Sequence, residues 1–285
     1  MAEQQPIFIR VRGELISFEQ PIVMGILNIT PDSFYEGSRK ETEKDIAERC
    51  TEIIAEGGRI IDIGAYSSRS HAVHISEEEE MKRLRMGLAI IKKENPQAIL
   101  SVDTFRANVA RMCVEDYGVD IINDISGGLL DTQMASTVGK LGVPYILMHM
   151  KGTPQTMQDN ITYEHLVPEV MTYFSRRIEE LRAEGVKDII VDPGFGFAKT
   201  LAHNYELMKH LEDFHLFNAP LLVGVSRKSM IYHLLGGTPT EALNGTTILN
   251  TIALQKGAHI LRVHDVKEAV EAIRIVEAVK NGITK

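Results

Sequence analysis

Short apolar segments that alternate with amphipathic segments constrain the fold of this chain more than any other feature. The apolar segments are rich in Val, Ile and Leu, and each has the length of a single β-strand. Strands that are apolar on both faces are buried on both faces, and in alternation with helices they form a parallel sheet. The eight segments occupy residues 21–28, 59–64, 98–103, 119–124, 144–150, 188–192, 219–225 and 259–264.

Eight strand–helix units predict an α/β fold, specifically a (β/α)8 TIM barrel. A doubly wound open sheet remains an alternative, because the number of strands does not prove that the sheet closes. A chain of 285 residues suits a single barrel domain over residues 1–285. The alternating apolar and polar residues at 7–18 predict a short N-terminal β-hairpin across the barrel floor.

Three of the amphipathic segments carry signals for the ends of helices. The segment 41–58 ends in a pair of glycines that suits a C-cap. The segment 76–91 begins with Ser76 and has Glu79 three positions later, which predicts a capping box. The segment 238–257 begins with Thr238 followed by proline, and we expect one continuous helix there.

Charge and cysteine content narrow the possible partners and the compartment. The net charge of −8 argues against nucleic acid as a partner, although an anionic small molecule could still bind a local cluster of cations. No apolar run has the roughly 20 residues needed to cross a bilayer. Cys50 and Cys113 lack metal-binding spacing and are expected to be free buried thiols. We therefore expect a soluble cytoplasmic protein without a membrane partner.

Polar residues gather at the carboxyl ends of the predicted strands. In a barrel these ends meet at one rim, which is where such enzymes place their active sites. The sequence thus predicts a functional site at this rim. The strand-end residues are Asn28, Asp62, Asp103, Asn123, Asp124, His149, Lys151, Asp192, Lys228, Arg262 and His264.

Part of this set suits a flat, nitrogen-rich ring. Asp103 and Asp192 can accept hydrogen bonds from ring N–H and amino groups, and Asn123 and Lys228 can donate to ring nitrogens and a carbonyl. A fused pyrimidine such as a pterin presents that combination of donors and acceptors. The alternative is that the two aspartates only cap the chain segments that follow them.

Another part suits a diphosphate. Arg69, Arg262 and His264 could hold the anion, and Asn28 could offer a neutral oxygen to Mg²⁺, which often binds through few protein ligands and the phosphates of a substrate. Two alternatives remain open: Arg262 could form an ion pair inside the barrel, and His264 could serve at a helix start.

Lys228 and a histidine pair have further interpretations. A lysine near a strand end could form a Schiff base, and the adjacent cation Arg227 could lower its pKa. His71 and His74 have the spacing of a zinc motif, but no third ligand is evident nearby, so we favour a solvated loop.

Seven segments, taken together and in order, resemble the dihydropteroate synthase family. The resemblance covers essentially the whole predicted barrel, and seven short motifs in one order are far more specific than any one of them. They are MGILNITPDSF (24–34), DIGAYSSRS (62–70), SVDT (101–104), NDISG (123–127), DPGFGFAKT (192–200), SRKS (226–229) and RVHD (262–265).

The resemblance implies a defined reaction, in which 6-hydroxymethyl-7,8-dihydropterin diphosphate and 4-aminobenzoate give 7,8-dihydropteroate and diphosphate for folate synthesis. It implies catalytic roles for Asp103, Asp192, Lys228, Arg69 and Glu36. It implies a pterin diphosphate site formed by Ser68, Asp103, Asn123, Asp192, Lys228, Arg262 and His264. It implies a 4-aminobenzoate site formed by Phe34, Arg69, Phe197, Lys228 and Ser229, with Asn28 as the ligand of Mg²⁺.

The resemblance further implies a homodimer and inhibition by sulfonamides, which mimic 4-aminobenzoate. The sequence departs from the family pattern in two loops. Glu36 stands where the family often has aspartate, and Ser68-Arg69-Ser70 stands where it has Thr-Arg-Pro. The loss of the stiff proline affects the expected geometry of the 4-aminobenzoate site more than that of the pterin pocket.

Two other functions remain as alternatives. A pterin-binding barrel that hands a methyl group to a corrinoid protein would share the pterin pocket, but it would have no need of a diphosphate site. A catalytically inactive homologue could act as a binding module. Asn28, Arg69 and the SRKS segment favour the enzyme that uses a diphosphate over the methyl-transfer barrel, and Phe34, Glu36 and Arg69 favour it over the inactive homologue.

Overall fold

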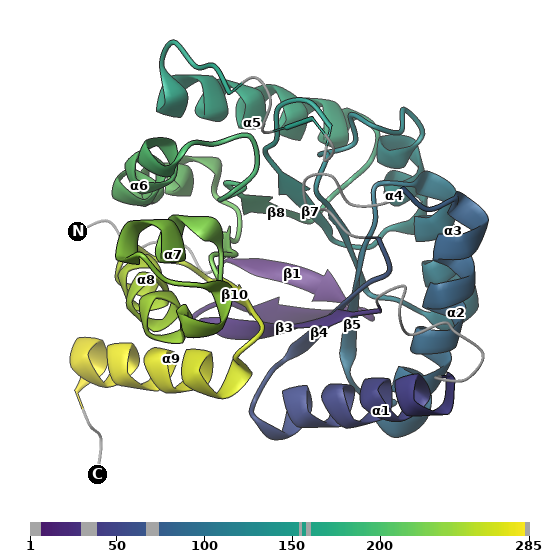
Figure 1. Cartoon of the computed structure of the whole chain (residues 1–285). Helices are drawn as coiled ribbons and strands as arrows, with labels where there is room; N and C mark the ends of the chain where they lie inside the picture. The colour runs from purple at the N-terminus through teal and green to yellow at the C-terminus, as the bar shows by residue number, and fades with distance from the viewer. Residues whose placement is uncertain (1–6, 30–38, 67–73, 154–155, 158–160, 283–285) are drawn as a thin grey trace.

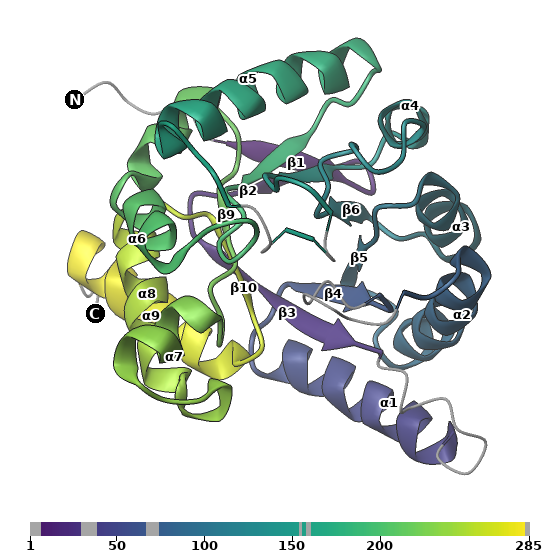
Figure 2. The ribbon, with the colours of Figure 1, turned by 45° about the horizontal axis from the view of Figure 1, so that its top comes forward.

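The structure is a computed structural model that describes residues 7–29, 39–66, 74–153, 156–157 and 161–282. Strands and helices alternate along the chain, and the helices surround the strands (Figure 1; Figure 2). The strands are β1 Phe8–Val11, β2 Glu14–Ser17, β3 Ile22–Asn28, β4 Ile60–Gly64, β5 Ile99–Asp103, β6 Ile121–Asp124, β7 Tyr145–Met148, β8 Ile189–Asp192, β9 Leu222–Val223 and β10 Ile260–Val263. The helices are α1 Arg39–Ala55, α2 Glu77–Glu94, α3 Ala107–Tyr117, α4 Met134–Leu141, α5 Leu166–Ala183, α6 Leu201–Lys209, α7 Ser229–Leu235, α8 Leu243–Gln255 and α9 Val266–Asn281, with the 3-10 turns η2 Leu211–Phe217 and η3 Pro239–Glu241.

The eight strands from β3 to β10 form one parallel sheet that is nearly closed. Their order is β8-β7-β6-β5-β4-β3-β10-β9. A parallel bridge between Val191 and Leu221 joins the two ends of this order. The predicted (β/α)8 barrel is therefore confirmed, and the open-sheet alternative is not.

The side chains inside the barrel explain why the strands are apolar on both faces. Outward side chains pack against the helices, and inward side chains fill the lower barrel as a separate layer. Each strand contributes to this inner layer, with Met24, Ile60, Ile99, Ile121, Ile146, Ile190, Leu222 and Ile260. The barrel is thus closed at the bottom, and only its upper end can hold a ligand.

The predicted N-terminal hairpin is confirmed and covers that lower end. Strands β1 and β2 pair antiparallel, and Ile9, Val11 and Phe18 pack against the inner layer. Arg12 and Gly13 form the two-residue turn with φ of 51° and 83°, the backbone geometry that suits a tight hairpin. Because the Arg12 guanidinium lies 2.8 Å from both carboxylate oxygens of Asp120, it fixes the hairpin to the barrel.

Each of the three segments has its predicted end signal, including Thr238, which forms a capping box with Glu241 at the start of η3. Gly57 and Gly58 follow α1 as expected, with Gly57 at φ 98°. The Ser76 hydroxyl accepts a hydrogen bond from the Glu79 N–H at 3.2 Å, so Ser76 is the N-cap of α2. The reciprocal half of the predicted box is replaced, since the Glu79 carboxylate binds Arg83 instead.

The continuous helix predicted over 238–257 is wrong. The Glu241 carboxylate accepts hydrogen bonds from the N–H and the hydroxyl of Thr238, which closes the separate turn η3. The carbonyls of Pro239 and Thr240 accept from the Arg227 guanidinium, and Pro239 O also accepts from the Ala242 N–H three residues on, as in a 3-10 turn. The α-helix therefore begins only at Leu243.

The seventh predicted strand is much shorter than expected. Pro220 has no N–H to donate to a ladder, and the chain after Val223 turns so that Lys228 N–H donates to Val225 O. Only Leu222 and Val223 form the strand β9. The early turn brings Lys228 back over the mouth of the barrel.

Both cysteines are free and buried, as predicted. In the described part of the chain, none of the helices combines the length and the apolarity that crossing a lipid bilayer requires.

Candidate functional site

The upper mouth of the barrel holds most of the predicted site residues, but not every polar strand end points into it. Neighbouring residues of a strand face opposite sides, so Asn123 faces inward and Asp124 faces the helices. The Asp124 carboxylate accepts hydrogen bonds from Ser126 N–H, Gly128 N–H and the Tyr145 hydroxyl. The predicted convergence of all strand-end polar groups is thus wrong for Asp124, which stabilises a loop.

A buried arginine between two aspartates forms the centre of the mouth. The Arg262 guanidinium lies 2.7 Å from Asp62 Oδ2 and 2.8 Å from Asp103 Oδ2. Asn123 Nδ2 donates to the same Asp62 oxygen at 3.0 Å. Glycine at position 224 leaves room beside Arg262, whose Cβ lies 3.8 Å from where a Gly224 Cβ would be. Arg262 therefore does form an ion pair inside the barrel, as the alternative held, and this ion pair is part of the candidate site.

The carboxylate of Asp103 is held near its titration point. Burial, opposed by the Arg262 cation and assisted by the nearby Asp62 and Glu80, raises the pKa of Asp103 to about 7. Its side chain is 15% exposed, whereas that of Asp62 is fully buried. Asp103 can therefore contact a ligand directly, whereas Asp62 contacts only the protein and holds Arg262 from below.

Two polar atoms below this group have no hydrogen-bond partner among the described residues. They are Asp62 Oδ1 and Ser101 Oγ, and Asp62 and Ser101 are partners in the register of β4 and β5. Buried polar atoms are rarely left unpaired in a finished site. The floor of the mouth thus retains acceptor capacity for a polar ligand or a water molecule.

Asp192 and Lys228 form a second charged group on the other side of the mouth. Asp192 is 6% exposed, and its Oδ1 accepts from Gly194 N–H at 2.8 Å. Burial raises the pKa of Asp192, and the Lys228 cation opposes this rise. The Lys228 ammonium donates to Phe195 O and lies 4.7 Å from the centre of the Phe197 ring. A flat ligand could therefore meet a carboxylate, an ammonium and an aromatic face here.

Burial, opposed by the Asp192 carboxylate and assisted by the Arg262 cation, lowers the pKa of Lys228 to about 8. The predicted influence of Arg227 is wrong, because the Arg227 guanidinium turns away and binds both oxygens of Asp265 at 2.8 and 2.9 Å. Ser229 follows Lys228 as the first residue of α7. The two charged groups act on each other, since Asp103 also affects the pKa of Lys228 and Asp192 that of Arg262.

His264 lies beside this centre as a neutral group. Its Nδ1 lies 3.1 Å from Ser226 Oγ, which also accepts the His264 backbone N–H. Partial burial of the ring, together with the Arg262 cation, lowers the pKa of His264 to about 4. At neutral pH His264 can therefore offer a diphosphate an N–H donor but not the positive charge that the sequence suggested.

Asn28 is the exposed last residue of the otherwise buried strand β3. Its Oδ1 lies 3.5 Å from where a Cβ on Gly64 would be, and that position is 3.4 Å from the Asp103 Cβ. Within the described ranges, no hydrogen bond of this amide and no cluster of three or more His, Cys, Asp or Glu suited to a metal occurs. A neutral exposed oxygen at the mouth fits the weak, largely hydrated binding of Mg²⁺ to a protein.

Four predicted site residues lie outside the described residues. They are Phe34, Glu36, Ser68 and Arg69. Of the histidine pair, His71 also lies outside, whereas His74 Nδ1 lies 3.1 Å from the Tyr66 hydroxyl.

Sequence reasoning missed two buried residues of the site. Asp62 was noticed only as a strand end, although its place on the inward face of β4, opposite Arg262, follows from the alternation of side chains. Lys199 was not singled out, although it stands inside the matched segment 192–200. It is 3% exposed and contacts His149.

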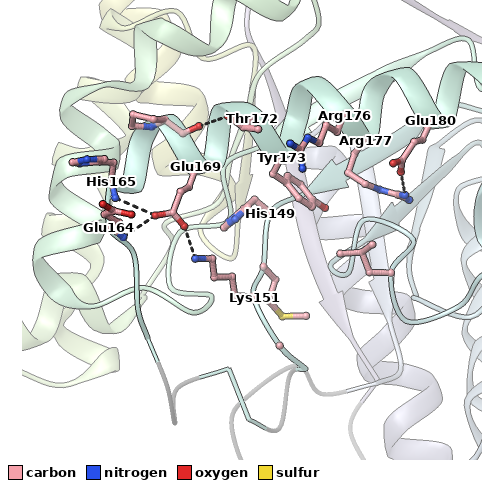
Figure 3. Close-up of a pocket in the computed structure, with 14 residues that line it drawn as sticks. His149, Lys151, Glu164, His165, Glu169, Thr172, Tyr173, Arg176, Arg177 and Glu180 are labelled. Atoms are coloured by element: carbon pink, nitrogen blue, oxygen red, sulfur yellow. Dashed lines mark hydrogen bonds and ion pairs between the residues drawn. The ribbon is translucent and has the colours of Figure 1, made fainter.

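A separate groove of about 720 Å³ lies beside the mouth, between α5 and the segment after β7 (Figure 3). Four of its charged side chains form two ion pairs: Lys151 Nζ lies 2.6 Å from Glu169 Oε2, and Arg177 pairs with Glu180. The Glu169 carboxylate also accepts two backbone N–H groups. These pairs leave little free charge for an anionic substrate, so we place the reaction at the barrel mouth.

Comparisons with known proteins agree with this geometry. The family model described as "Pterin binding enzyme" matches residues 24–264. Dihydropteroate synthase of Escherichia coli K12 is 43% identical over 269 residues, which cover 94% of each protein. A sulfonamide complex of dihydropteroate synthase from Yersinia pestis is 39% identical with a TM-score of 0.88, over 96% of this chain and 99% of that one. The enzyme of Xanthomonas albilineans with 4-aminobenzoic acid is 33% identical with a TM-score of 0.89, over 97% and 99%.

Proposed function

Because the chain belongs to the dihydropteroate synthase family of pterin-binding enzymes, we propose that the two charged groups at its barrel mouth divide the work of that reaction. The chain is a transferase that joins a dihydropterin diphosphate to 4-aminobenzoate and releases diphosphate. The observation that carries the division of roles is the pairing of two buried aspartates with Arg262 next to Asp192 and Lys228.

The first role is recognition of the pterin ring. Asp103 and Asp192 accept hydrogen bonds from its amino and N–H groups, while Asn123 and Lys228 donate to its other edge. Donation from the ring to Asp103 favours the ionised carboxylate, which the protein alone holds near a pKa of about 7. A ligand without these N–H groups would leave both carboxylates without the hydrogen bonds that the ring supplies, so the site selects against it.

The second role is handling of the diphosphate. Arg262 and the N–H of His264 lie on the side of the mouth where the leaving group would sit, and by family resemblance Ser68 and Arg69 join them. Asn28 would hold Mg²⁺, which when bound neutralises charge on the phosphate oxygens. Fixed donors that already point at this place stabilise the negative charge that grows as the bond to diphosphate breaks.

The third role is binding of 4-aminobenzoate. The Phe197 ring, the Lys228 ammonium and Ser229 at the start of α7 would border its subsite, with Phe34 contributing by resemblance. The pterin methylene gains positive character as diphosphate departs, and the amino nitrogen of 4-aminobenzoate attacks it and later loses a proton. The protein forms no covalent bond to substrate in this route. By resemblance Glu36 and Arg69 complete the site.

The direct test is an assay of the purified protein with the pterin diphosphate, 4-aminobenzoate and Mg²⁺. Equal amounts of dihydropteroate and diphosphate are expected. Release of diphosphate without dihydropteroate would exclude the proposed coupling. A borohydride-trapped adduct on Lys228 would favour the Schiff-base alternative instead.

Replacing Asn28 with alanine is expected to raise the Mg²⁺ concentration for half-maximal activity about tenfold or more, since changes around a metal site commonly cost 10- to 100-fold in affinity. Titration of activity with Mg²⁺ measures this, and EDTA should abolish activity in both proteins. Asn108→Ala on the surface of α3 is the matched control. An unchanged Mg²⁺ dependence of Asn28→Ala would remove Asn28 from the metal site.

Sulfonamides are expected to compete with 4-aminobenzoate for the subsite beside Phe197 and Lys228. The apparent KM for 4-aminobenzoate should rise in proportion to inhibitor concentration, with kcat unchanged. Steady-state kinetics at saturating pterin diphosphate provides the measurement. A fall in kcat at constant KM would place the inhibitor elsewhere.

We further propose a homodimer in the cytoplasm. Large apolar side chains are exposed on three neighbouring helices, α7, α8 and α9, on one side of the barrel (Figure 1). They are Leu234, Leu235, Ile248, Ile275 and Val279. Exposed apolar side chains gathered on neighbouring helices commonly mark an interface, and sedimentation equilibrium would give the mass of the assembly.

A further inference from the structure

Lys199 is a buried cation that the reaction described above does not use. It precedes Thr200, the N-cap of α6, and its side chain points inward, with 3% of the residue exposed. Its Nζ lies 2.9 Å from Gly194 O, 3.0 Å from Phe197 O, 3.3 Å from His149 O and 3.0 Å from His149 Nδ1. Three N–H donors thus face four acceptors, an arrangement that suits the ammonium form.

Keeping a charge in this place is costly. No carboxylate lies within ion-pair distance of Lys199 in the described part of the chain, and an unpaired buried ammonium loses several kcal/mol of hydration. Burial accordingly lowers the pKa of Lys199 to about 7. His149, whose pKa lies well below its usual value because of burial and the Lys199 charge, stays neutral and can accept. A buried charge that costs this much free energy indicates that the ammonium has a structural or functional role at this position.

The segment that Lys199 holds contains one strained residue. Ala198 has φ of 48°, in the left-handed region that costs alanine about 1–2 kcal/mol, whereas Gly194 and Gly196 adopt φ of 74° and 80° without that cost. A Cβ on Gly194 would lie 2.1 Å from His149 O, so the segment rests directly against the end of β7. Without a cation between them, the carbonyl oxygens that meet at Lys199 Nζ would repel one another.

The same segment forms one wall of the active site. Phe195 O accepts from Lys228 Nζ, the Phe197 ring lies under that ammonium, and Gly194 N–H donates to Asp192. Each of these contacts depends on the backbone conformation between Asp192 and Lys199. The position of the Phe197 ring is the most sensitive to loss of the Lys199 ammonium, because Phe197 O itself accepts a hydrogen bond from it.

We propose that Lys199 is a positioning residue, whose buried ammonium ties the carbonyls of the 193–198 segment to the end of β7 and so shapes the 4-aminobenzoate subsite around Phe197 and Lys228. This inference rests on the proposed function for the identity of the ligand. It assigns Lys199 no contact with substrate.

The test replaces Lys199 with methionine, which has a similar length and no charge, in the full chain. The KM for 4-aminobenzoate should rise about tenfold or more, while calorimetry should give a Kd for the pterin diphosphate within about threefold of the unmodified protein, since Asp103, Asn123 and Arg262 are untouched. Lys187→Met, at an exposed position just before β8, is the matched control and should change neither quantity.

An unchanged KM for 4-aminobenzoate would overturn the proposal, and so would equal losses for both ligands, which indicate general structural support. If K199M does not fold, Lys199→Gln keeps two N–H donors on a shorter, neutral side chain. Its KM should rise at least about threefold, and a wild-type KM would overturn the proposal. Failure of the unmodified protein to make dihydropteroate would instead reject the proposed function, which keeps the two outcomes distinct.

Discussion

Replacing Asp192 with asparagine is expected to lower kcat/KM for the pterin diphosphate about a thousandfold or more while the barrel stays folded. The carboxylate lies almost fully buried at the end of β8. An asparagine there would present an amide N–H to ring N–H groups that need an acceptor, and sites built for such hydrogen bonds discriminate by factors of about 10⁴–10⁵. Loss of its negative charge would also lower the pKa of Lys228 further, since Asp192 raises it.

Calorimetric Kd values for the pterin ligand and steady-state kinetics would measure the effect. Asp188→Asn is the matched control, because Asp188 immediately precedes the same strand at its opposite end. Thermal unfolding should show that both variants are folded. Pterin affinity that remains at the wild-type level in Asp192→Asn would show that Asp192 only caps its own loop through Gly194.

Replacing Arg262 with methionine is expected to lower the free energy of unfolding by about 3–5 kcal/mol at pH 7, the usual cost of removing one partner from a buried ion pair. Two carboxylates, Asp62 and Asp103, would share the site without their common cation. Activity should fall to background as well, because Arg262 stands at the proposed diphosphate site.

The stability loss of Arg262→Met should depend on pH with a defined sign. Burial already raises the pKa of Asp103 from 3.8 to about 7, and without Arg262 it would rise further. Between the unfolded and the folded pKa the folded state binds more protons, so stability falls as the pH rises through this window. Wild type and variant should share this slope between pH 4 and 7. The loss caused by the substitution should grow above pH 7, where Asp103 ionises beside Arg262 in the wild type but stays protonated in the variant.

Chemical denaturation of both proteins at pH 7 and pH 9 would test this. The double variant Asp62→Asn/Arg262→Met should regain most of the stability and none of the activity. Arg85→Met removes an exposed ion pair with Asp116, both side chains being 47% exposed, and should cost less than about 1 kcal/mol. A loss of equal size at both pH values would contradict the role given to Asp103.

The fold was largely predictable because its signals are local. Apolar runs identified every strand of the barrel, and cap residues identified helix ends. The predicted lengths were wrong for β9 and for the helix over 238–257, where contacts outside the local pattern matter. Arg227 binds the carbonyls of the turn before α8, and this contact cannot be read from residues 238–257. Pro220 is visible in the segment 219–225, but the turn at Lys228 that further shortens β9 is not.

The candidate site was predictable only in part. The order of motifs identified the strand ends that carry Asp103, Asn123, Asp192, Lys228 and Arg262, and the structure brings these side chains to one mouth. Their roles toward substrate stay predictions, as do those of Phe34, Glu36, Ser68 and Arg69. The sequence also overstated the charge of His264, since a pKa near 4 results from its neighbours and its partial burial.

The sequence by itself determined the alternation of strands and helices, the family of the chain and the types of side chain at the barrel rim, because periodicity and motif order are properties of the linear chain. Only the tertiary structure decided which face each side chain takes, that Asp62 and Asp103 share one arginine, and that Lys199 is buried among carbonyls. These facts depend on distances between residues far apart in the chain and on exclusion of water, and both arise only when the barrel closes.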